Sequence, residues 1–445
     1  MDETEITVVY RVYRVRWVQL LVYFLATFAN TLPSVTFVPI EAETAIFFKI
    51  TSTEVNTLAI VFLFLYVPGT FLSIWAYRSF SMRSGMIIGS LLNLGVWIRL
   101  FALIWPSCSY PILMVGQFFP AITAPLFLNL TALFAARWFS PQQRDIATAI
   151  GSMAMPLGGA IGALLPSLIV TDGISSHSFF ILLTIEAAFT TLTMLLVIAI
   201  FRSEPSSPPS PSEEHHQTIN FKQDLGRLFA NSHYLILLFG FSFGFAAFLS
   251  ITTLAYQLIQ PSGYSSENAG VFGATLITAG LISSYVVGII MGHTHAYRSL
   301  LKVLVVGACA SVFYFIVILR PNMLYPLGVS IALLGFFLMP LLPISFECAV
   351  ECTYPVRAEW STGLLLCAGN VLGGGFTFLL GYLIKLAPVY KPGVIFTHAS
   401  IFIICIFIIG GLALIMFKGP YLRLEAERMA VEKCTVNISG AIRSE

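Results

Sequence analysis

The sequence predicts an all-α membrane protein in which twelve transmembrane helices form two pseudo-symmetric six-helix bundles. Three observations lead to this fold class: the composition, the length of the apolar runs, and a polar linker that divides these runs into six and six. Of the 445 residues, 57% are hydrophobic and 10% are charged, whereas soluble domains carry about 25% charged residues. A water-soluble globule is therefore excluded, and the lipid bilayer is the expected partner of most of the surface. The net charge of +2 indicates no nucleic-acid partner.

Twelve apolar runs are long enough to cross a bilayer, which takes about 20 residues of helix. The strands of a membrane β-barrel need only about 10 residues of alternating polarity, so the length of the runs favours helices. The predicted spans are 17–40, 57–77, 85–105, 110–135, 146–170, 179–201, 234–259, 269–291, 299–319, 324–348, 361–385 and 395–417.

The distribution of basic residues predicts that both termini lie in the cytoplasm, because cytoplasmic loops of membrane proteins carry an excess of Lys and Arg. If residues 1–16 are cytoplasmic, most of the 23 Lys and Arg residues fall on that side. Those on the outside are Lys49, Arg320, Lys385 and Lys391. The segment 418–445 is then a cytoplasmic tail.

The stretch 202–233 is the predicted linker between the two bundles, 17–201 and 234–417. Its first part is rich in Pro, Ser and Glu, a composition that cannot bury a core. Its second part has apolar residues near helical spacing and is predicted to be a short amphipathic helix on the inner membrane surface. These apolar residues are Ile219, Leu225, Leu228 and Phe229.

The two halves also match at a constant offset, at the junctions that lead into the fifth and eleventh spans. The matched pairs are Pro141 with Pro355, Asp145 with Glu359, Thr148 with Thr362, and Gly159 with Gly373. Parallel six-helix repeats are the plan of major facilitator transporters, which bind substrate at the midplane between the halves.

Five segments of the chain carry motifs of one known family. The most specific is Pro-Ile-Ser-Phe-Glu-Cys-Ala-Val-Glu-Cys-Thr-Tyr-Pro at 343–355, supported by motifs at 66–68, 92–99 and 116–117 and by the tail segment 419–427. Together they resemble solute carrier family 49, the feline leukaemia virus subgroup C receptor-related transporters, and the tail is most similar to its orphan branch. The resemblance implies a major facilitator fold and transport of choline, ethanolamine or haem-linked solutes, with pyridoxine export in another branch. It also implies the plasma membrane, with an endolysosomal membrane as the alternative.

The chain departs from this family at the expected choline site. The family's aromatic positions in helices 1 and 7 fall at Ser34 and Leu249, and its glutamines in helices 5 and 11 fall at Pro156 and Asn370. A quaternary ammonium is best held by aromatic faces. Neither Ser34 nor Leu249 provides one.

Polar residues in the helices expected to line the central path are candidates for the substrate cavity. Each could form a hydrogen bond to a solute at low dielectric, and a helix-packing role is the alternative for each. The candidates are Asn30, Ser34, Gln117, Asn129, Leu249, Tyr256, Gln257 and Asn370.

Charged residues near the cytoplasmic end of the tenth span predict a gate. Glu347 and Glu351 are four residues apart and therefore share one helix face. We expect them to pair with the arginines of the matching helix end and the adjoining loops when the cavity faces outward. These arginines are Arg137, Arg144 and Arg357. The alternative is a static ion pair that fixes the turn between helices 10 and 11.

Two further charges are predicted within spans, where they are costly. Glu186 lies about 10 Å deep in the sixth span at 1.5 Å per residue. It either carries a proton for coupled transport, since burial raises a carboxyl pKa, or bonds a neighbouring hydroxyl. Arg99, near the outer end of the third span, is expected to snorkel to the surface.

The function predicted from these features is secondary transport of a small organic solute, an amine, vitamin or haem-related metabolite, by alternating access. A receptor or lipid-handling protein without solute flux is the alternative. The chain contains no His-Glu-x-x-His, Gly-x-Ser-x-Gly or phosphate-binding Gly-x-x-x-x-Gly-Lys motif, so an enzyme is not expected. No cofactor or metal site is predicted, and a monomer is expected.

Overall fold

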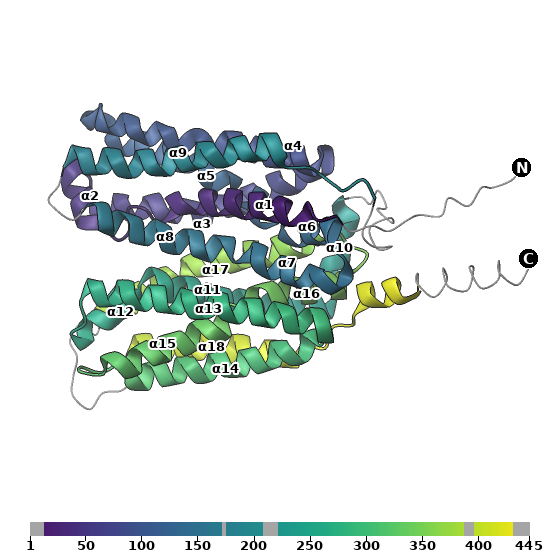
Figure 1. The fold of residues 1–445 in the computed structure, drawn as a ribbon. Helices are drawn as coiled ribbons and strands as arrows, with labels where there is room; N and C mark the ends of the chain where they lie inside the picture. The colour runs from purple at the N-terminus through teal and green to yellow at the C-terminus, as the bar shows by residue number, and fades with distance from the viewer. Residues whose placement is uncertain (1–12, 171–174, 208–220, 387–395, 430–445) are drawn as a thin grey trace, which may run out of the picture.

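The computed structural model describes residues 13–170, 175–207, 221–386 and 396–429, and within these ranges the regular structure is entirely helical. The helices form two groups that lie side by side, one from each half of the chain (Figure 1). The predicted all-α fold class is confirmed. Residues 1–12, most of the Pro- and Ser-rich linker (208–220) and the end of the tail (430–445) lie outside the described ranges.

The N-terminal half contains the helices up to residue 200. They are α1 (Arg16–Thr31), η1 (Leu32–Ser34), α2 (Glu41–Phe48), α3 (Ser52–Ser79), α4 (Met82–Asn93), η2 (Leu94–Leu103), η3 (Pro106–Cys108), α5 (Ser109–Leu128), α6 (Thr131–Trp138), α7 (Pro141–Ser152), α8 (Ala154–Ile169) and α9 (Ser176–Ile200).

The C-terminal half begins with α10, which occupies the part of the linker where an amphipathic helix is predicted. Its helices are α10 (Phe221–Ala230), α11 (Ser232–Thr253), α12 (Ala255–Ile259), η5 (Gln260–Ser262), α13 (Ser266–Thr294), α14 (Tyr297–Ile318), α15 (Leu324–Leu338), α16 (Leu341–Thr353), α17 (Ala358–Leu386) and α18 (His398–Met416). One further helix covers residues 422–429, and we call it the tail helix.

Eleven helical stretches in the described ranges are long and apolar enough to cross a membrane. The remaining predicted crossing, 17–40, is not one continuous helix. The α-helix ends at Thr31 after 16 residues, and a three-residue 3₁₀ turn follows, so that α1 and η1 together rise about 30 Å. Pro33 lies within this turn, and because proline has no backbone N–H it cannot continue the helical ladder.

The fourth and tenth predicted spans are each divided into two helices. The fourth consists of α5 and α6, and the tenth of α15 and α16, which is preceded by Pro340. Pro120 and Pro125 lie inside α5. Breaks of this kind are tolerated in a membrane protein where the freed backbone groups are buried in protein rather than lipid, and both divided spans are largely buried.

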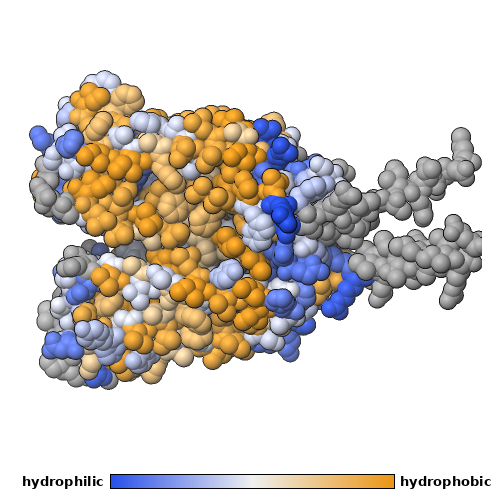
Figure 2. Space-filling model, in the orientation of Figure 1, coloured by the Kyte–Doolittle hydropathy of each residue, from blue (hydrophilic) through white to orange (hydrophobic). Residues whose placement is uncertain are grey.

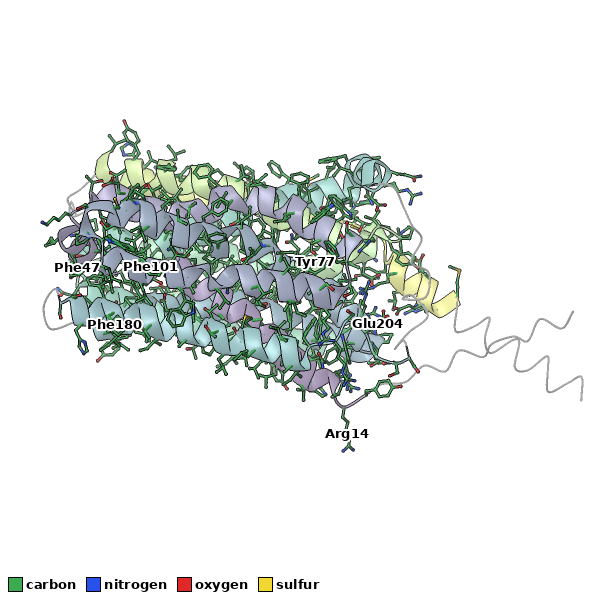
Figure 3. The ribbon with its side chains drawn as sticks, turned by 90° about the horizontal axis from the view of Figure 1, so that it is seen from above. Arg14, Phe47, Tyr77, Phe101, Phe180 and Glu204 are labelled. Carbon is green, nitrogen blue, oxygen red and sulfur yellow. The ribbon has the colours of Figure 1, made fainter. Side chains whose placement is uncertain are left out.

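The exterior shows how the bundle meets lipid. Apolar side chains cover most of the visible sides of both bundles, and hydrophilic residues gather at the end where α1 begins and the tail helix ends (Figures 1 and 2). We call this end the terminal face; it also carries the α3–α4, α13–α14 and α16–α17 turns. Arg14 and Glu204 lie at the terminal face, whereas Phe47 and Phe180 lie toward the opposite end (Figure 3).

Within each half, glycines allow helices to approach backbone to backbone. A Cβ at Gly162 in α8 would clash with the carbonyl oxygen of Leu32, and one at Gly335 in α15 with that of Leu276 in α13. Small residues at helix interfaces let the backbones approach closely. The resulting van der Waals packing stabilises helix association in lipid, where no hydrophobic driving force acts between helices. These contacts fix the positions of the helices that surround the space between the halves.

We predict that Gly335→Ala lowers the midpoint of thermal unfolding in detergent, because the methyl group meets the backbone of α13 rather than a side chain that could move. Overpacking of this kind costs about 1–3 kcal/mol. The matched control is Gly375→Ala in α17, where a Cβ would have no neighbour within 4 Å and alanine favours the helix by about 0.5–1 kcal/mol. Equal midpoints for the two variants would contradict the close packing of α13 and α15.

Candidate functional site

A cavity of about 40 Å³ lies among helices of the C-terminal half and reaches the N-terminal half at Pro156. α11 contributes Phe241, Phe245 and Phe248 to its wall, and Ser345 comes from α16. The N-terminal half contributes Pro156 of α8, the position that corresponds to a family glutamine. The C-terminal half thus forms most of the wall of this cavity, and its lining is mostly apolar.

The phenylalanine rings form a connected series along α11. The rings of Phe241 and Phe245 stack with centroids 5.5 Å apart and 13° between their planes. The ring centroids of Phe245 and Phe248 are 6.4 Å apart. A Cβ at Gly369 in α17 would lie 2.7 Å from Cδ1 of Phe245, so the backbone of α17 holds this ring in place. Sequence reasoning missed these rings, because nothing in the pattern separates them from the other apolar residues of a chain with 38 Phe.

Ser345 supplies the polar side chain of the lining. Its residue is fully buried, and its Oγ has no hydrogen-bond partner among the described residues. A buried hydroxyl without a partner costs about 1–3 kcal/mol. It is therefore available to form a hydrogen bond with a solute in this cavity.

Three of the candidate cavity residues form hydrogen bonds inside the N-terminal half. Asn30 donates through Nδ2 to the carbonyl oxygen of Pro120 (2.9 Å) and to Oδ1 of Asn93 (3.1 Å). Gln117 donates to the carbonyl oxygen of Pro33 (2.9 Å), and Ser34 donates to that of Thr31 (2.6 Å). Gln117 and Ser34 thus stabilise the break at the end of α1, and Asn30 ties α1 to α4 and α5.

Asn129 is a candidate that the structure places at the contact between the halves. Its Oδ1 accepts a hydrogen bond from Tyr66 (3.0 Å), and its Nδ2 donates to Oγ of Ser73 (3.0 Å). A Cβ at Gly363 of α17 would lie 3.0 Å from that Nδ2. Asn129 therefore fixes α5 against α3 next to the opposite half.

The other candidates lie in the C-terminal half. Leu249 packs against Gly373, where a Cβ would lie 2.8 Å from its Cδ1. Asn370 is buried and donates to the carbonyl oxygen of Leu366 (2.9 Å). Tyr256 and Gln257 are exposed on α12, at the end opposite the terminal face (Figure 1).

Arg99 does not snorkel to the surface, and that prediction was wrong. Its Nη2 lies 2.8 Å from Oε2 of Glu186, and the two side chains are 0% and 1% exposed. Oε1 of Glu186 accepts a hydrogen bond from Thr36 (2.8 Å). A buried carboxylate is stable only when it is paired and hydrogen-bonded, so Glu186 holds Arg99 inside the bundle. The clue in the sequence was two opposite charges in spans of the same half.

The acidic pair at the terminal face is bridged by an arginine that sequence reasoning missed. Arg423 of the tail helix donates through Nε to Oε1 of Glu351 (2.9 Å) and through Nη2 to Oε2 of Glu347 (2.7 Å). The backbone N–H of Leu424 donates to the other oxygen of Glu351 (3.1 Å). Burial alone would lower the pKa of Arg423, but Glu351 and Glu347 outweigh burial and raise this pKa above its ordinary value.

The predicted arginine partners of these acids are engaged elsewhere, so that pairing was wrong. Arg144 lies 2.9 Å from Oε1 of Glu427 in the tail helix. Arg357 pairs with Glu359 and donates to the carbonyl oxygen of Tyr77 (3.4 Å). Arg137 is half-buried and forms no ion pair with another residue in the described ranges. The prediction failed because it considered only the arginines of the bundle and its loops, whereas the tail helix supplies Arg423.

Several contacts join the two halves at the terminal face. Thr148 of α7 donates to Oε1 of Glu347 (2.7 Å). Tyr297, at the start of α14, donates to Oδ2 of Asp145 in α7 (3.0 Å). A Cβ at Gly292 would lie 2.6 Å from the carbonyl oxygen of Gln142. The halves are therefore in close contact on this side of the cavity.

Comparison with known proteins identifies relatives over most of the chain. The family model described as Major Facilitator Superfamily matches residues 20–358. Solute carrier family 49 member A3 of Xenopus tropicalis is 31% identical, over 82% of this chain and 77% of the relative. The choline/ethanolamine transporter flvcr2a of Danio rerio is 29% identical, over 84% of this chain and 82% of the relative.

Solved structures of other transporters share the fold. The E. coli fucose:proton symporter FucP superposes with a TM-score of 0.68 at 16% identity, covering 92% of this chain and 100% of that one. The proton:xylose symporter XylE gives a TM-score of 0.73 at 12% identity, covering 92% of this chain and 98% of that one.

We predict that Glu186→Leu lowers the free energy of unfolding by about 3–5 kcal/mol, because it leaves the Arg99 guanidinium buried without its partner. The double variant Arg99→Met with Glu186→Leu should recover most of this loss. Thermal unfolding of the purified variants measures both effects, with Glu204→Leu, at an exposed acid, as the control. A double variant less stable than either single variant would contradict the mutual neutralisation.

The proton-carrying role of Glu186 stays a prediction, and transport by Glu186→Gln with an unaltered pH dependence would exclude it.

Proposed function

The chain belongs to the major facilitator superfamily and, within it, to solute carrier family 49, and we propose that the small organic solute it transports is a compact amine. Relatives of this chain are named choline/ethanolamine transporters. A secondary transporter of this superfamily moves its solute by alternating access to a site between the halves.

The observation that carries the choice of solute is the series of phenylalanine rings beside the cavity. An ammonium group over an aromatic face gains about 0.5–2 kcal/mol, more when the site is dry. Leu249 itself has no aromatic face, but Phe245 and Phe248 lie one helical turn and one residue before it on α11. They supply the aromatic surface that the family position lacks, and Ser345 offers a hydrogen bond to a hydroxyl or amino group of the solute.

Alternating access explains the uneven contact between the halves. The hydrogen bonds between Thr148 and Glu347 and between Asp145 and Tyr297 close the cavity on the terminal face.

We assign this face to the cytoplasm, because the excess of Lys and Arg falls there, and we take the plasma membrane as the location. The monomer is the expected unit, since one chain contains both halves. A tag at either chain end that antibodies reach in intact cells would contradict this orientation.

The gate residues proposed from the sequence retain this role with a different set of partners. Glu347 and Glu351 form its C-terminal side and Arg144 its N-terminal side, while Arg357 fixes the α16–α17 turn through Glu359. Arg137, at the end of α6, stays a candidate partner for a carboxylate when the halves separate. Opening toward the cytoplasm then requires the contacts of Thr148 and Asp145 to break.

We predict saturable uptake of choline or ethanolamine by liposomes that contain the purified protein, and a 5- to 30-fold higher apparent KM for Phe245→Leu, which corresponds to about 1–2 kcal/mol. Leucine keeps the apolar contact but removes the aromatic face. The matched control is Phe313→Leu, at a ring that is 54% exposed on α14. If no amine is taken up while the protein is folded, or if both variants behave alike, the proposed solute class is wrong. Specific binding without flux would favour a receptor or lipid-handling protein.

A further inference from the structure

The tail helix contacts both halves of the transporter at the terminal face, although it follows the last membrane span. We propose that the segment 419–429 holds the two halves together on this face. It does so through a chain of alternating charges that runs from α16 to α7. This inference rests on the proposed alternating-access cycle, and it concerns how the closed state of that cycle is stabilised.

The charge chain consists of four groups in series. Glu347 and Glu351 of α16 provide the first negative group, and Arg423 is the positive group between them and the rest of the tail helix. Glu427 follows Arg423 by four residues, so both project from the same face of the tail helix. Oε1 of Glu427 lies 2.9 Å from Nη1 of Arg144 in α7. Charges therefore alternate from the C-terminal half through the tail helix to the N-terminal half.

Burial makes this chain strong. The exposed fractions of the five side chains lie between 1% and 8%, so water screens them little. Glu347 and Glu351 are like charges one turn apart, and Arg423 is placed between them, with one N–H donor to each carboxylate. Removal of one partner of a buried ion pair destabilises the protein far more than the intact pair stabilises it, because an uncompensated buried charge remains. Each link therefore constrains the next.

The tail segment is anchored to the C-terminal half. The Tyr421 hydroxyl accepts a hydrogen bond from the backbone N–H of Arg298 (3.0 Å), and the Arg298 guanidinium lies 4.5 Å from the centre of the Tyr421 ring. Only residues 417–421 separate the tail helix from α18. Because Arg423 also binds acids of α16, the tail helix moves with the C-terminal half when the halves separate.

This anchoring identifies the contact that must break. The pair of Arg144 and Glu427 joins the tail helix to the N-terminal half, and Thr148 adds a hydrogen bond from the same helix α7 to Glu347. Opening of the terminal face breaks both the ion pair of Arg144 with Glu427 and the hydrogen bond of Thr148 with Glu347. Loss of the Glu427 charge should therefore shift the resting population toward the state that is open to the cytoplasm, without a change in the cavity lining.

The distance between spin labels at Arg83→Cys in α4 and Ser299→Cys in α14 tests this inference. Both positions are exposed at the terminal face on opposite halves, and the labels are placed in a background without reactive native cysteines. No solute is needed, so the result does not depend on the proposed solute class. We expect mainly short distances in the parent and at least a tenfold rise in the ratio of long to short distances for Glu427→Gln. Glu425→Gln, an exposed acid on the same helix, is the matched control and should match the parent.

A charge exchange makes the test specific to the pair. Arg144→Glu alone should open the terminal face as Glu427→Gln does, and Arg144→Glu with Glu427→Arg should restore the short distances at least in part. A Glu427→Gln distribution equal to that of Glu425→Gln would overturn the inference. So would a charge-exchanged protein that is folded, by its unfolding midpoint, yet as open as Arg144→Glu alone. Because the exchange keeps both charges, it also remains informative if Glu427→Gln is too unstable to purify.

Discussion

Charges that leave water at the terminal face must be neutralised by other charges of the chain, and this constraint determines how the tail, the gate and the two halves are arranged. Glu347 and Glu351 are buried on one face of α16, where two carboxylates repel each other. Arg423 satisfies both, and its position brings Glu427 to Arg144 of the other half. One of the contacts between the halves thus follows from the way Arg423 pairs with two buried acids.

The same constraint acts near the other end of the N-terminal half. The pair of Arg99 and Glu186 is fully buried and receives a third partner in Thr36, just beyond the break at Pro33. Gln117 donates to the carbonyl oxygen that this break leaves free. Polar groups inside the bundle therefore stabilise an irregular stretch of backbone, while the described lining of the cavity consists of aromatic and other apolar residues and the unpartnered hydroxyl of Ser345. Stability and solute binding use different sets of polar residues.

The sequence predicts most of the fold because hydrocarbon imposes simple rules on length and polarity. Long apolar runs, a polar linker and the bias of basic residues lead to two helical bundles. They do not reveal the rotation of a helix about its axis, which decides whether Asn30 faces a solute or Asn93. They also cannot reveal that Arg99 and Glu186 lie at the same depth on facing helices.

The candidate site was less predictable for related reasons. The acids of α16 were identified from their spacing, but their partner Arg423 lies 72 residues from Glu351, in a segment whose composition resembles an ordinary charged tail. The phenylalanines of α11 were missed because apolar residues fill every span, and only the packed structure shows which of them surround a space. Charged residues inside apolar spans stand out in a single sequence. The role of a phenylalanine among many others depends on where the fold places it.

We expect the cavity to open to one side of the membrane at a time. Counterflow of labelled choline tests it most directly, in liposomes that contain the purified protein and are preloaded with an excess of unlabelled choline. If the binding site is exposed alternately, labelled choline should rise transiently above its equilibrium level, because inward-facing sites return occupied by unlabelled solute. Labelled choline that only equilibrates, at a rate independent of the internal choline concentration, would indicate a continuous pore or passive leak and would contradict the account.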